Sequence, residues 1–293
     1  MKSDDSTFVP HQSQLSATLS EVPWWLLVVM LVGLIMVYNI TTNEDYSSIF
    51  SFLKNGVFIT VRVTITAYIF AVIIGLLAGL GRVSKNPIIY NIATLYVQIM
   101  RGIPILVTIL YVSFVLYPMI IDGVAWVAQS IAVIGLGDSE GFWANITASD
   151  INRMMGGAEY SMLYRGIMAL ALSYGSFSAE IFRAGIESIE KGQMEAARSL
   201  GMSYIQAMRY IILPQAIRRV LPPLGNDFIA MLKESSLVSV LGVRDITQLG
   251  KLYSARSFLY LETYNQVAFL YLTMTILLSL GVRALENRLK SGQ

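Results

Sequence analysis

The sequence contains no cysteine and a single histidine, His11, in a chain of 293 residues. The absence of thiols excludes disulfide frameworks, thiolate metal sites and cysteine nucleophiles. A lone histidine in a polar N-terminal segment cannot build an imidazole metal centre or a Ser-His-Asp triad. The sequence therefore predicts no metal site and no catalytic residues, and we expect a protein that is not an enzyme.

Charged residues are also scarce. They make up 14% of the chain, against roughly 25% in soluble domains, while 55% of the residues are hydrophobic. A water-soluble fold would have to cover its surface with polar groups that this composition lacks, whereas lipid tails accept an apolar exterior. The composition therefore predicts a polytopic membrane protein.

Long apolar windows predict where the chain crosses the membrane. A helix needs about 20 apolar residues to span roughly 30 Å of hydrocarbon, so we expect an all-α transmembrane helical bundle. Arg101-Gly102-Ile103-Pro104 breaks the third window, and Arg165 and Glu180 shorten the fourth. The expected spans are 24–40, 57–80, 91–117, 162–182, 217–243 and 266–282.

The distribution of Lys and Arg predicts the orientation of these spans. Positive charges are more numerous in the segments that face the cytoplasm when both termini are inside. No signal-peptide cleavage pattern follows the first window, so we expect it to be retained. We therefore expect polar cytoplasmic tails at 1–22 and 287–293.

Two loops are long enough to have roles of their own. The segment 119–160 is expected outside and is net acidic, and its apolar stretch 124–136 is too short to cross the membrane. We expect that stretch to form a helix lying at the outer surface. The other long loop, 186–214, is expected in the cytoplasm.

The cytoplasmic loop reads as a helix, a turn and a second helix. Good helix formers run from Gln193 to Leu200, Gly201 suits the helix end, and Ser203 can cap a second helix ending near Pro214. Small side chains in the first helix would let a partner approach its backbone closely. From helix-forming tendencies alone, a solvated amphipathic connector is as good an explanation of this loop as a docking site for a partner.

Several motifs in a fixed order resemble a known family. Glu195-Ala196-Ala197, Gly201 and Ile212-Leu213-Pro214 resemble the EAA loop of ABC importer permeases. The stretches 178–186, 191–193, 101–104 and 237–243 are similar to the branch that imports histidine, glutamine, arginine and other polar amino acids. The chain thus resembles a binding-protein-dependent type I ABC importer permease, with a MetI-like transmembrane domain expected over 54–286 and an added helix over 23–41.

The resemblance implies a transport subunit in a bacterial inner membrane, driven by a separate ATPase that docks on the EAA loop. This chain has no phosphate-binding loop motif, so ATP and Mg would be bound by the ATPase. Further implied partners are an extracytoplasmic amino acid binding protein, membrane lipid and a second permease, identical or homologous, and no nucleic acid is implied. The implied coupling residues are Gln193, Glu195, Ala196, Ala197, Arg198, Leu200 and Gly201.

Charges inside the expected spans are candidates for a substrate pathway, because buried charge in a membrane is costly. An amino acid needs a cation for its carboxylate and an anion for its ammonium, so Arg101 and Glu234 are candidates, with Asn226 and Ser235 as neutral partners. Arg101 has an equal alternative role in holding the bent end of a helix. Arg62 can reach the interface by extending its side chain.

Other transport classes account for less of the sequence. An ion-coupled secondary amino acid transporter would use similar spans, but it would show an inverted repeat and would not need the 195–214 loop. A channel needs a filter of like residues contributed by several subunits. The sequence does not say which amino acid is carried.

Overall fold

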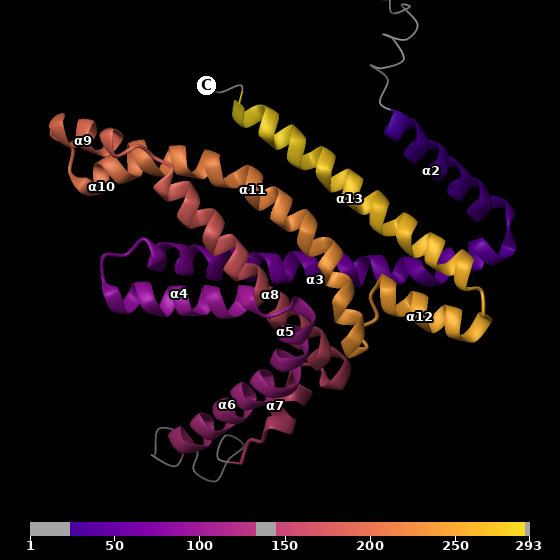
Figure 1. Ribbon diagram of the computed structural model, residues 1–293. Coiled ribbons are helices and arrows are strands. Elements are labelled where there is room, and N and C mark those ends of the chain that lie inside the picture. Colours follow the sequence, from indigo (N-terminus) through magenta and orange to yellow (C-terminus); the bar gives the residue numbers. More distant parts are fainter. Residues whose placement is uncertain (1–23, 133–144, 291–293) are drawn as a thin grey trace, which may run out of the picture.

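The computed structural model describes residues 24–132 and 145–290, which form helices joined by short connections (Figure 1). No strand occurs within these two ranges. The all-α class expected from the sequence is therefore confirmed for the described part of the chain. The expected tail 1–22, with His11, and the last residues of the C-terminal tail lie outside the described residues.

The first two helices meet at a tight corner. Helix α2 (Trp24–Thr42) covers the first expected span, and α3 (Glu44–Arg82) begins two residues after α2 ends. The side chain of Asn43 caps α3 by accepting a hydrogen bond from the Asp45 N–H at 2.9 Å, which satisfies a donor that the first helical turn leaves unpaired. The expected span 57–80 is the C-terminal part of α3, which is 39 residues long.

The chain breaks at Pro104, as the sequence predicts. Helix α4 (Pro87–Gly102) runs back along α3 (Figure 1), and the backbone of Ile103 is extended, with φ −102° and ψ 133°. A residue before proline avoids the helical region, because the proline ring clashes with its N–H and Cβ. The expected span 91–117 is therefore two separate elements and not one bent helix.

A continuous helical path follows Pro104. Helix α5 (Ile105–Tyr111) passes through the π-helical turn η1 (Val112–Leu116) into α6 (Tyr117–Ile131), with helical backbone angles at both junctions. Pro118 has no N–H to donate to the helix. The π turn accommodates it, because the i→i+5 hydrogen bonds of the turn already leave one carbonyl without a partner. The helix expected over 124–136 is present over 124–131, where it continues the helical path that begins at Ile105, and its place at the outer surface stays a prediction. The remainder of that stretch, from 133 on, lies outside the described residues.

Helix α8 (Gly157–Glu187) crosses the centre of the structure after the short helix α7 (Ala148–Met154). It packs on α3 more extensively than any other helix does. A Cβ added to Gly75 would lie 2.5 Å from the Ser178 Cβ, and one added to Gly79 would lie 2.8 Å from the Phe182 Cβ. Glycine at these points lets the two helix backbones approach closely, as small residues do in membrane proteins.

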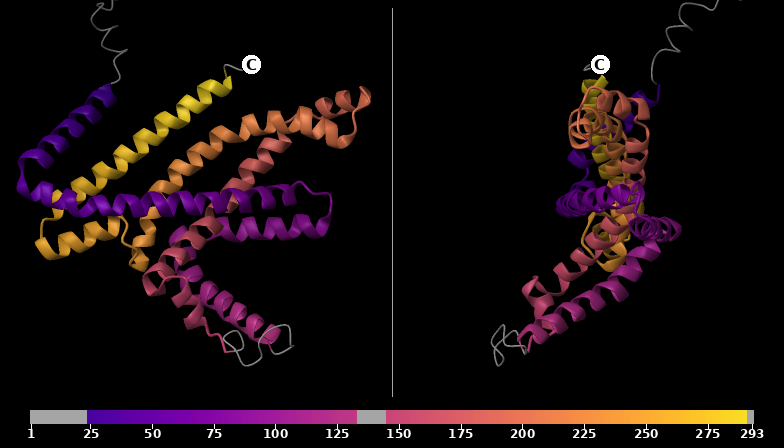
Figure 2. Two further views of the ribbon diagram at one scale, coloured as in Figure 1. Left: turned by 180° about the vertical axis from the view of Figure 1, so that it is seen from behind. Right: turned by 90° about the vertical axis from the view of Figure 1, so that its left-hand side faces the viewer.

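The rest of the chain forms a helical hairpin, a long return helix and two further helices. In Figures 1 and 2 the hairpin lies toward the same side of the structure as the start of α2 and the end of α13, while α6 and α7 extend toward the other side. The elements are α9 (Lys191–Ser199), α10 (Tyr204–Ala207), the π turn η4 (Met208–Ile212), α11 (Leu213–Glu234), the 3₁₀ segment η5 (Ser235–Leu241), α12 (Ile246–Ser257) and α13 (Tyr260–Lys290).

By length and composition, three described helical segments could cross a membrane: 44–82, 105–131 and 260–288. A shorter apolar helix, Leu26–Thr42, lies within α2. The expected spans 162–182 and 217–243 correspond to α8 and to α11 with η5, which contain more polar residues. Polar groups of α8 such as Ser173, Ser176 and Ser178 are fully buried against other helices, so they do not face lipid.

Candidate coupling surface and translocation site

The α9–α10 hairpin is held in place by a small apolar cluster of its own chain. Ile189, Ile212 and Ala216 are buried at the centre of this cluster, and Met194 of α9 and Met208 pack against it. The first hairpin helix therefore packs one side against its own chain. Its orientation is fixed before any partner binds.

Gly201 ends α9 as the sequence predicts. Its φ of +81° lies in the left-handed region that favours glycine. The Gly201 N–H donates to the Arg198 carbonyl at 3.0 Å, and the Met202 N–H donates to the Ala197 carbonyl at 3.2 Å. This pair of bonds is the Schellman motif, which satisfies carbonyls left unpaired at the helix end. The turn that follows is therefore set by local hydrogen bonds.

The second hairpin helix begins as predicted but does not end as predicted. The Ser203 hydroxyl accepts a hydrogen bond from the Gln206 N–H, and the Gln206 side chain accepts one from the Ser203 N–H at 2.8 Å, forming a capping box. Pro214 does not stop the helix. The π turn η4 precedes it, so the helical path from α10 continues through Pro214 into α11.

The expected coupling residues do not all lie on one side of α9. Ala197 is 4% exposed and faces its own chain, so its side chain cannot contact a docking partner. Leu200 is 83% exposed, and Tyr204 and Ile205 beside it are exposed as well. Neither Tyr204 nor Ile205 was singled out from the sequence, although both follow the Ser203 cap as large apolar residues outside the expected spans. We define the coupling surface as the exposed residues Gln193, Glu195, Ala196, Arg198, Leu200, Gly201, Tyr204 and Ile205.

Two carboxylates on α11 form the centre of a possible translocation site. Asp227 and Glu234 are seven residues apart, so they lie on one face of the helix, two turns from each other. The Ser178 hydroxyl of α8 donates to the Asp227 carboxylate at 3.1 Å. Asp227 therefore faces α8, the helix that leads into the coupling hairpin.

Aromatic rings from three helices lie in the region of Asp227. Tyr68 of α3 lies with its ring centroid 5.0 Å from that of Phe228, and its hydroxyl donates to the Leu224 carbonyl on α11. On α8, the rings of Tyr174 and Phe177 are 5.7 Å apart. An acid with aromatic rings nearby suits a cationic group, because carboxylates and ring faces both attract positive charge.

Sequence reasoning named Glu234 but missed Asp227. The signal was present, since a period of seven places the two acids on one face of α11. Asn226, which the sequence favoured, is exposed, and Ser235 is buried with its hydroxyl donating to the Leu232 carbonyl at 2.7 Å. Glu234 therefore shares a face of α11 with Asp227, while the Ser235 hydroxyl is engaged by the Leu232 carbonyl.

Arg101 takes part in an ion-pair cluster at the end of α4. Its guanidinium lies 3.0 Å from the carboxylate of Glu180 on α8, which also pairs with Arg82 of α3 and with Arg183. The Arg101 guanidinium also lies over the Phe177 ring, 5.6 Å from its centroid. This arrangement fastens the ends of α3 and α4 to α8. It fits the structural role that the sequence left open for Arg101, while the substrate role stays a prediction.

The helical fold, the membrane-spanning segments and the hairpin define a transmembrane subunit of a transporter. The chain belongs to the family "Binding-protein-dependent transport system inner membrane component", whose pattern matches residues 71–291. It is therefore a permease subunit of an ABC importer and not an enzyme, as the sequence predicts. Permeases of this family work with an ATPase, a binding protein and a second permease subunit.

Individual relatives agree with this assignment. The chain is 35% identical to the probable amino-acid permease protein YxeN of Bacillus subtilis, over 81% of this chain and 91% of that protein. It is 34% identical to the probable glutamine ABC transporter permease protein GlnM of B. subtilis (82% and 94% covered) and 32% identical to the glutamine transport system permease protein GlnP of Escherichia coli K12 (84% and 98% covered). The resemblance stated from the sequence motifs is confirmed.

Solved structures confirm the fold. A crystal structure of an amino acid ABC transporter with histidines matches with a TM-score of 0.62 at 33% identity, over 81% of this chain and 94% of that one. The methionine ABC transporter MetNI, in an inward-facing conformation, matches with a TM-score of 0.57 at 20% identity, over 81% and 96%. The second likeness concerns the fold alone, and it is the MetI-like fold expected from the sequence.

Proposed function

We propose that this chain is the permease of an ATP-driven importer of polar amino acids. The observation that carries the proposal is the α9–α10 hairpin, which presents an exposed coupling surface on a base anchored by Ile189, Ile212 and Ala216. A connector that only joined two helices would not need a large apolar side chain as exposed as Leu200. Relatives named as amino-acid and glutamine permeases support the substrate class.

The hairpin connects mechanically to the possible translocation site. Helix α8 leads into α9, and the helical path from α10 continues into α11. These two helices carry Ser178 and Asp227, whose side chains are hydrogen bonded to each other. A partner ATPase that moved α9 would therefore shift the helices on both sides of that contact.

The acids of α11 would receive the ammonium group that every amino acid carries. Asp227 and Glu234 supply negative charge, and Tyr68, Tyr174 and Phe177 supply rings in the region of Asp227. A carboxylate inside a membrane protein is costly, so it is retained where it has a function. Arg101, Asn226 and Ser235 remain predicted pathway residues.

The remaining assignments follow the same proposal. ATP and Mg would be bound by the partner ATPase and not by this chain. Both termini would lie in the cytoplasm, which is supported by the placement of the start of α2 and the end of α13 toward the side of the hairpin (Figure 2). A binding protein would deliver substrate from outside, and a second permease, identical or homologous, would complete the pathway.

The proposal is tested by reconstituting the permease with its ATPase and binding protein in liposomes. Glu195→Lys should insert and fold normally but lower ATP-dependent amino acid uptake at least about tenfold, since a charge-assisted contact contributes about 1.5–3 kcal/mol. Gly201→Asp should insert normally and also lower uptake, because aspartate strains the left-handed turn that ends α9. Glu286→Lys on α13 makes the same charge change away from the coupling surface and should leave uptake intact. Uptake that proceeds without the ATPase, driven by an ion gradient, would instead support a secondary transporter.

A further inference from the structure

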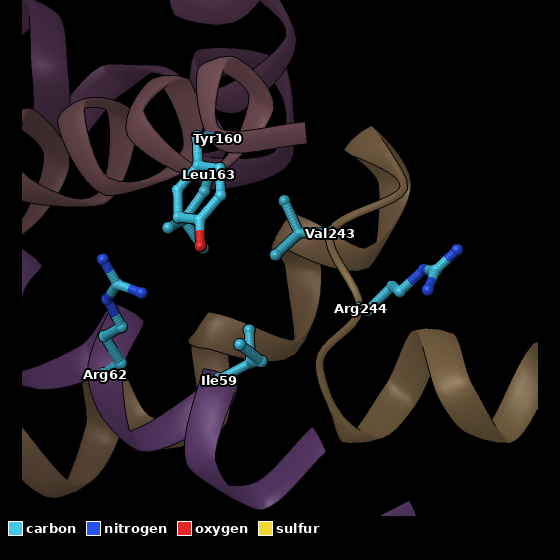
Figure 3. A pocket seen from close by; sticks show the side chains of 6 residues that line it. All are labelled: Ile59, Arg62, Tyr160, Leu163, Val243 and Arg244. Atoms are coloured by element: carbon cyan, nitrogen blue, oxygen red, sulfur yellow. The ribbon is translucent and has the colours of Figure 1, made fainter. Parts of the chain in front are cut away.

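A pocket lined by arginines lies away from both sites described above. It is formed by Ile59 and Arg62 of α3, Tyr160 and Leu163 of α8, and Val243 and Arg244 of the connection between η5 and α12. In Figure 3 the Arg62 guanidinium turns toward Tyr160, whose hydroxyl points into the space between the elements, while Arg244 extends outward on the opposite side. The cavity volume is about 120 Å³, several times the roughly 10–15 Å³ that one water needs.

An adjoining pocket extends this cavity along an apolar path. It shares Ile59 and Arg244 with the first pocket and is lined further by Phe52, Leu249 and Leu252. Its volume is about 500 Å³. Arg256 of α12 stands on its wall together with Arg244. Asn55 also lines this pocket, and Phe52, Leu249 and Leu252 form its apolar side, called the apolar channel below.

The arginines of these pockets lack an acidic partner among the described residues. No carboxylate within those ranges lies within 4.0 Å of the guanidinium groups of Arg62, Arg244 or Arg256. Asp245 is next to Arg244 in sequence, but it is fully buried and accepts hydrogen bonds from the Gln248 N–H at 2.8 Å and the Tyr271 hydroxyl at 3.1 Å. Its carboxylate is therefore engaged in the protein interior.

The loop that carries Arg244 is held against α3. The Ile246 N–H donates to the Thr60 hydroxyl of α3 at 3.3 Å. Gly56 allows this approach, since a Cβ there would lie 2.7 Å from the Ile246 nitrogen. A ligand that binds here therefore meets a loop already held in place, which reduces the ordering cost of binding.

The neighbouring surface has the character of a membrane interface. Phe258 is 76% exposed and Tyr260 is 52% exposed, both within a few residues of Arg256. Exposed aromatic residues gather at the level of the lipid headgroups, where a ring can contact both hydrocarbon and water. The arginines at this end are therefore placed where phosphate groups are the abundant anions.

We propose that the two pockets bind an anionic phospholipid, with its phosphate held by Arg244 and Arg256 and an acyl chain lying along Phe52, Leu249 and Leu252. Arginine matches phosphate geometry through parallel N–H donors, and the Tyr160 hydroxyl can donate an additional hydrogen bond. The apolar channel distinguishes a lipid from a small soluble anion, because a soluble anion would leave that channel unfilled. The proposal requires only that the chain lies in a membrane, and it does not depend on the substrate.

The test reconstitutes the permease–ATPase complex in nanodiscs with equal amounts of phosphatidylglycerol and phosphatidylcholine. The complex is then extracted into detergent, and native mass spectrometry identifies the lipids that stay bound to it. The wild type should retain phosphatidylglycerol in preference to phosphatidylcholine. The double variant Arg244→Gln, Arg256→Gln should retain about tenfold less of it, because each substitution removes a charge-assisted contact, and the Arg→Lys double variant should restore part of the binding. Arg153→Gln, whose side chain is 83% exposed and outside these two pockets, is the matched control.

Three results would overturn the proposal. The first is equal retention of the two lipids by the wild type. The second is unchanged phosphatidylglycerol retention in the double variant, with the complex still assembled. The third is full displacement of the lipid by millimolar glycerol phosphate or by free amino acids, which would assign the pockets to a soluble anion. Amino acid uptake measured on the same preparations separates these outcomes from a failure of the proposed transport function.

Discussion

The α3–α8 crossing and the α9–α10 hairpin are built on opposite principles. At the crossing, Gly75 and Gly79 let the backbones of α3 and α8 pack so closely that no room is left between them. At the hairpin, a small cluster around Ile212 holds the base, while Leu200, Tyr204 and Ile205 remain exposed. The crossing is complete within this chain, whereas the hairpin presents a surface that suits a partner.

This difference separates substitutions that damage folding from those that damage assembly. Changes at the crossing meet backbone and side-chain atoms that cannot move away, because protein interiors are closely packed. Changes on the exposed side of the hairpin meet no atoms of this chain. The next predictions use that contrast, beginning with the largest expected effect.

Gly75→Leu should prevent the chain from folding. A Cβ added at this position would lie 2.5 Å from the Ser178 Cβ. Adding single methylene groups to a packed core typically costs about 1–3 kcal/mol, and a leucine side chain adds several carbon atoms. The measurement is the yield of monodisperse permease after extraction in mild detergent. Gly281→Leu on α13, where no atom lies within 4 Å of an added Cβ, should give the wild-type yield. Equal yields from both variants would show that the crossing is looser than described.

Asp227→Asn should leave the fold intact but lower amino acid uptake about tenfold. The amide has the same shape and can still accept the Ser178 hydrogen bond, so only the negative charge offered to an ammonium group is lost, and a tenfold loss corresponds to about 1.4 kcal/mol. The assay is ATP-dependent uptake in liposomes with the ATPase rate measured in parallel. Lys233→Gln, on the exposed side of α11, serves as the control. Unchanged uptake by Asp227→Asn would remove this residue from the pathway.

Ala196→Leu and Ala197→Leu should differ although the residues are neighbours. Ala197 is 4% exposed, so leucine there should loosen the hairpin by about 1–3 kcal/mol and speed amide hydrogen exchange over 191–212. Ala196 is exposed, so leucine there should leave exchange unchanged and weaken binding of the ATPase. The test measures amide hydrogen exchange and ATPase binding for both variants. Identical behaviour would mean that the hairpin has no distinct buried and docking sides.

Local features of the coupling loop could be predicted from the sequence because local rules set them. Gly201 ends α9 and Ser203 begins α10, since each satisfies backbone groups within a few residues. The end of the second helix was predicted wrongly. Proline normally interrupts a helix. No local sequence signal predicts the π turn that allows the helical path to continue through Pro214.

The side on which a residue lies was harder to predict than the helix that carries it. Ala196 and Ala197 were treated alike, and only the packing around Ile212 leaves one exposed and the other buried. For Arg101, the sequence left two equal alternatives, a substrate ligand and a structural residue. The carboxylate of Glu180, 79 residues away in sequence, lies beside it in the structure.

The sequence by itself determined that this chain lies in a membrane, that it is helical and that it carries the EAA motif of ABC importer permeases, because hydrophobic content, helix-end signals and motif order are all local properties. Tertiary structure decided which polar side chains meet: Glu180 pairs with Arg82, Arg101 and Arg183, and Asp227 accepts a hydrogen bond from Ser178. It also brought Arg62 and Arg244 to the walls of one pocket. These contacts join residues distant along the chain, and only the packing of whole helices brings them together.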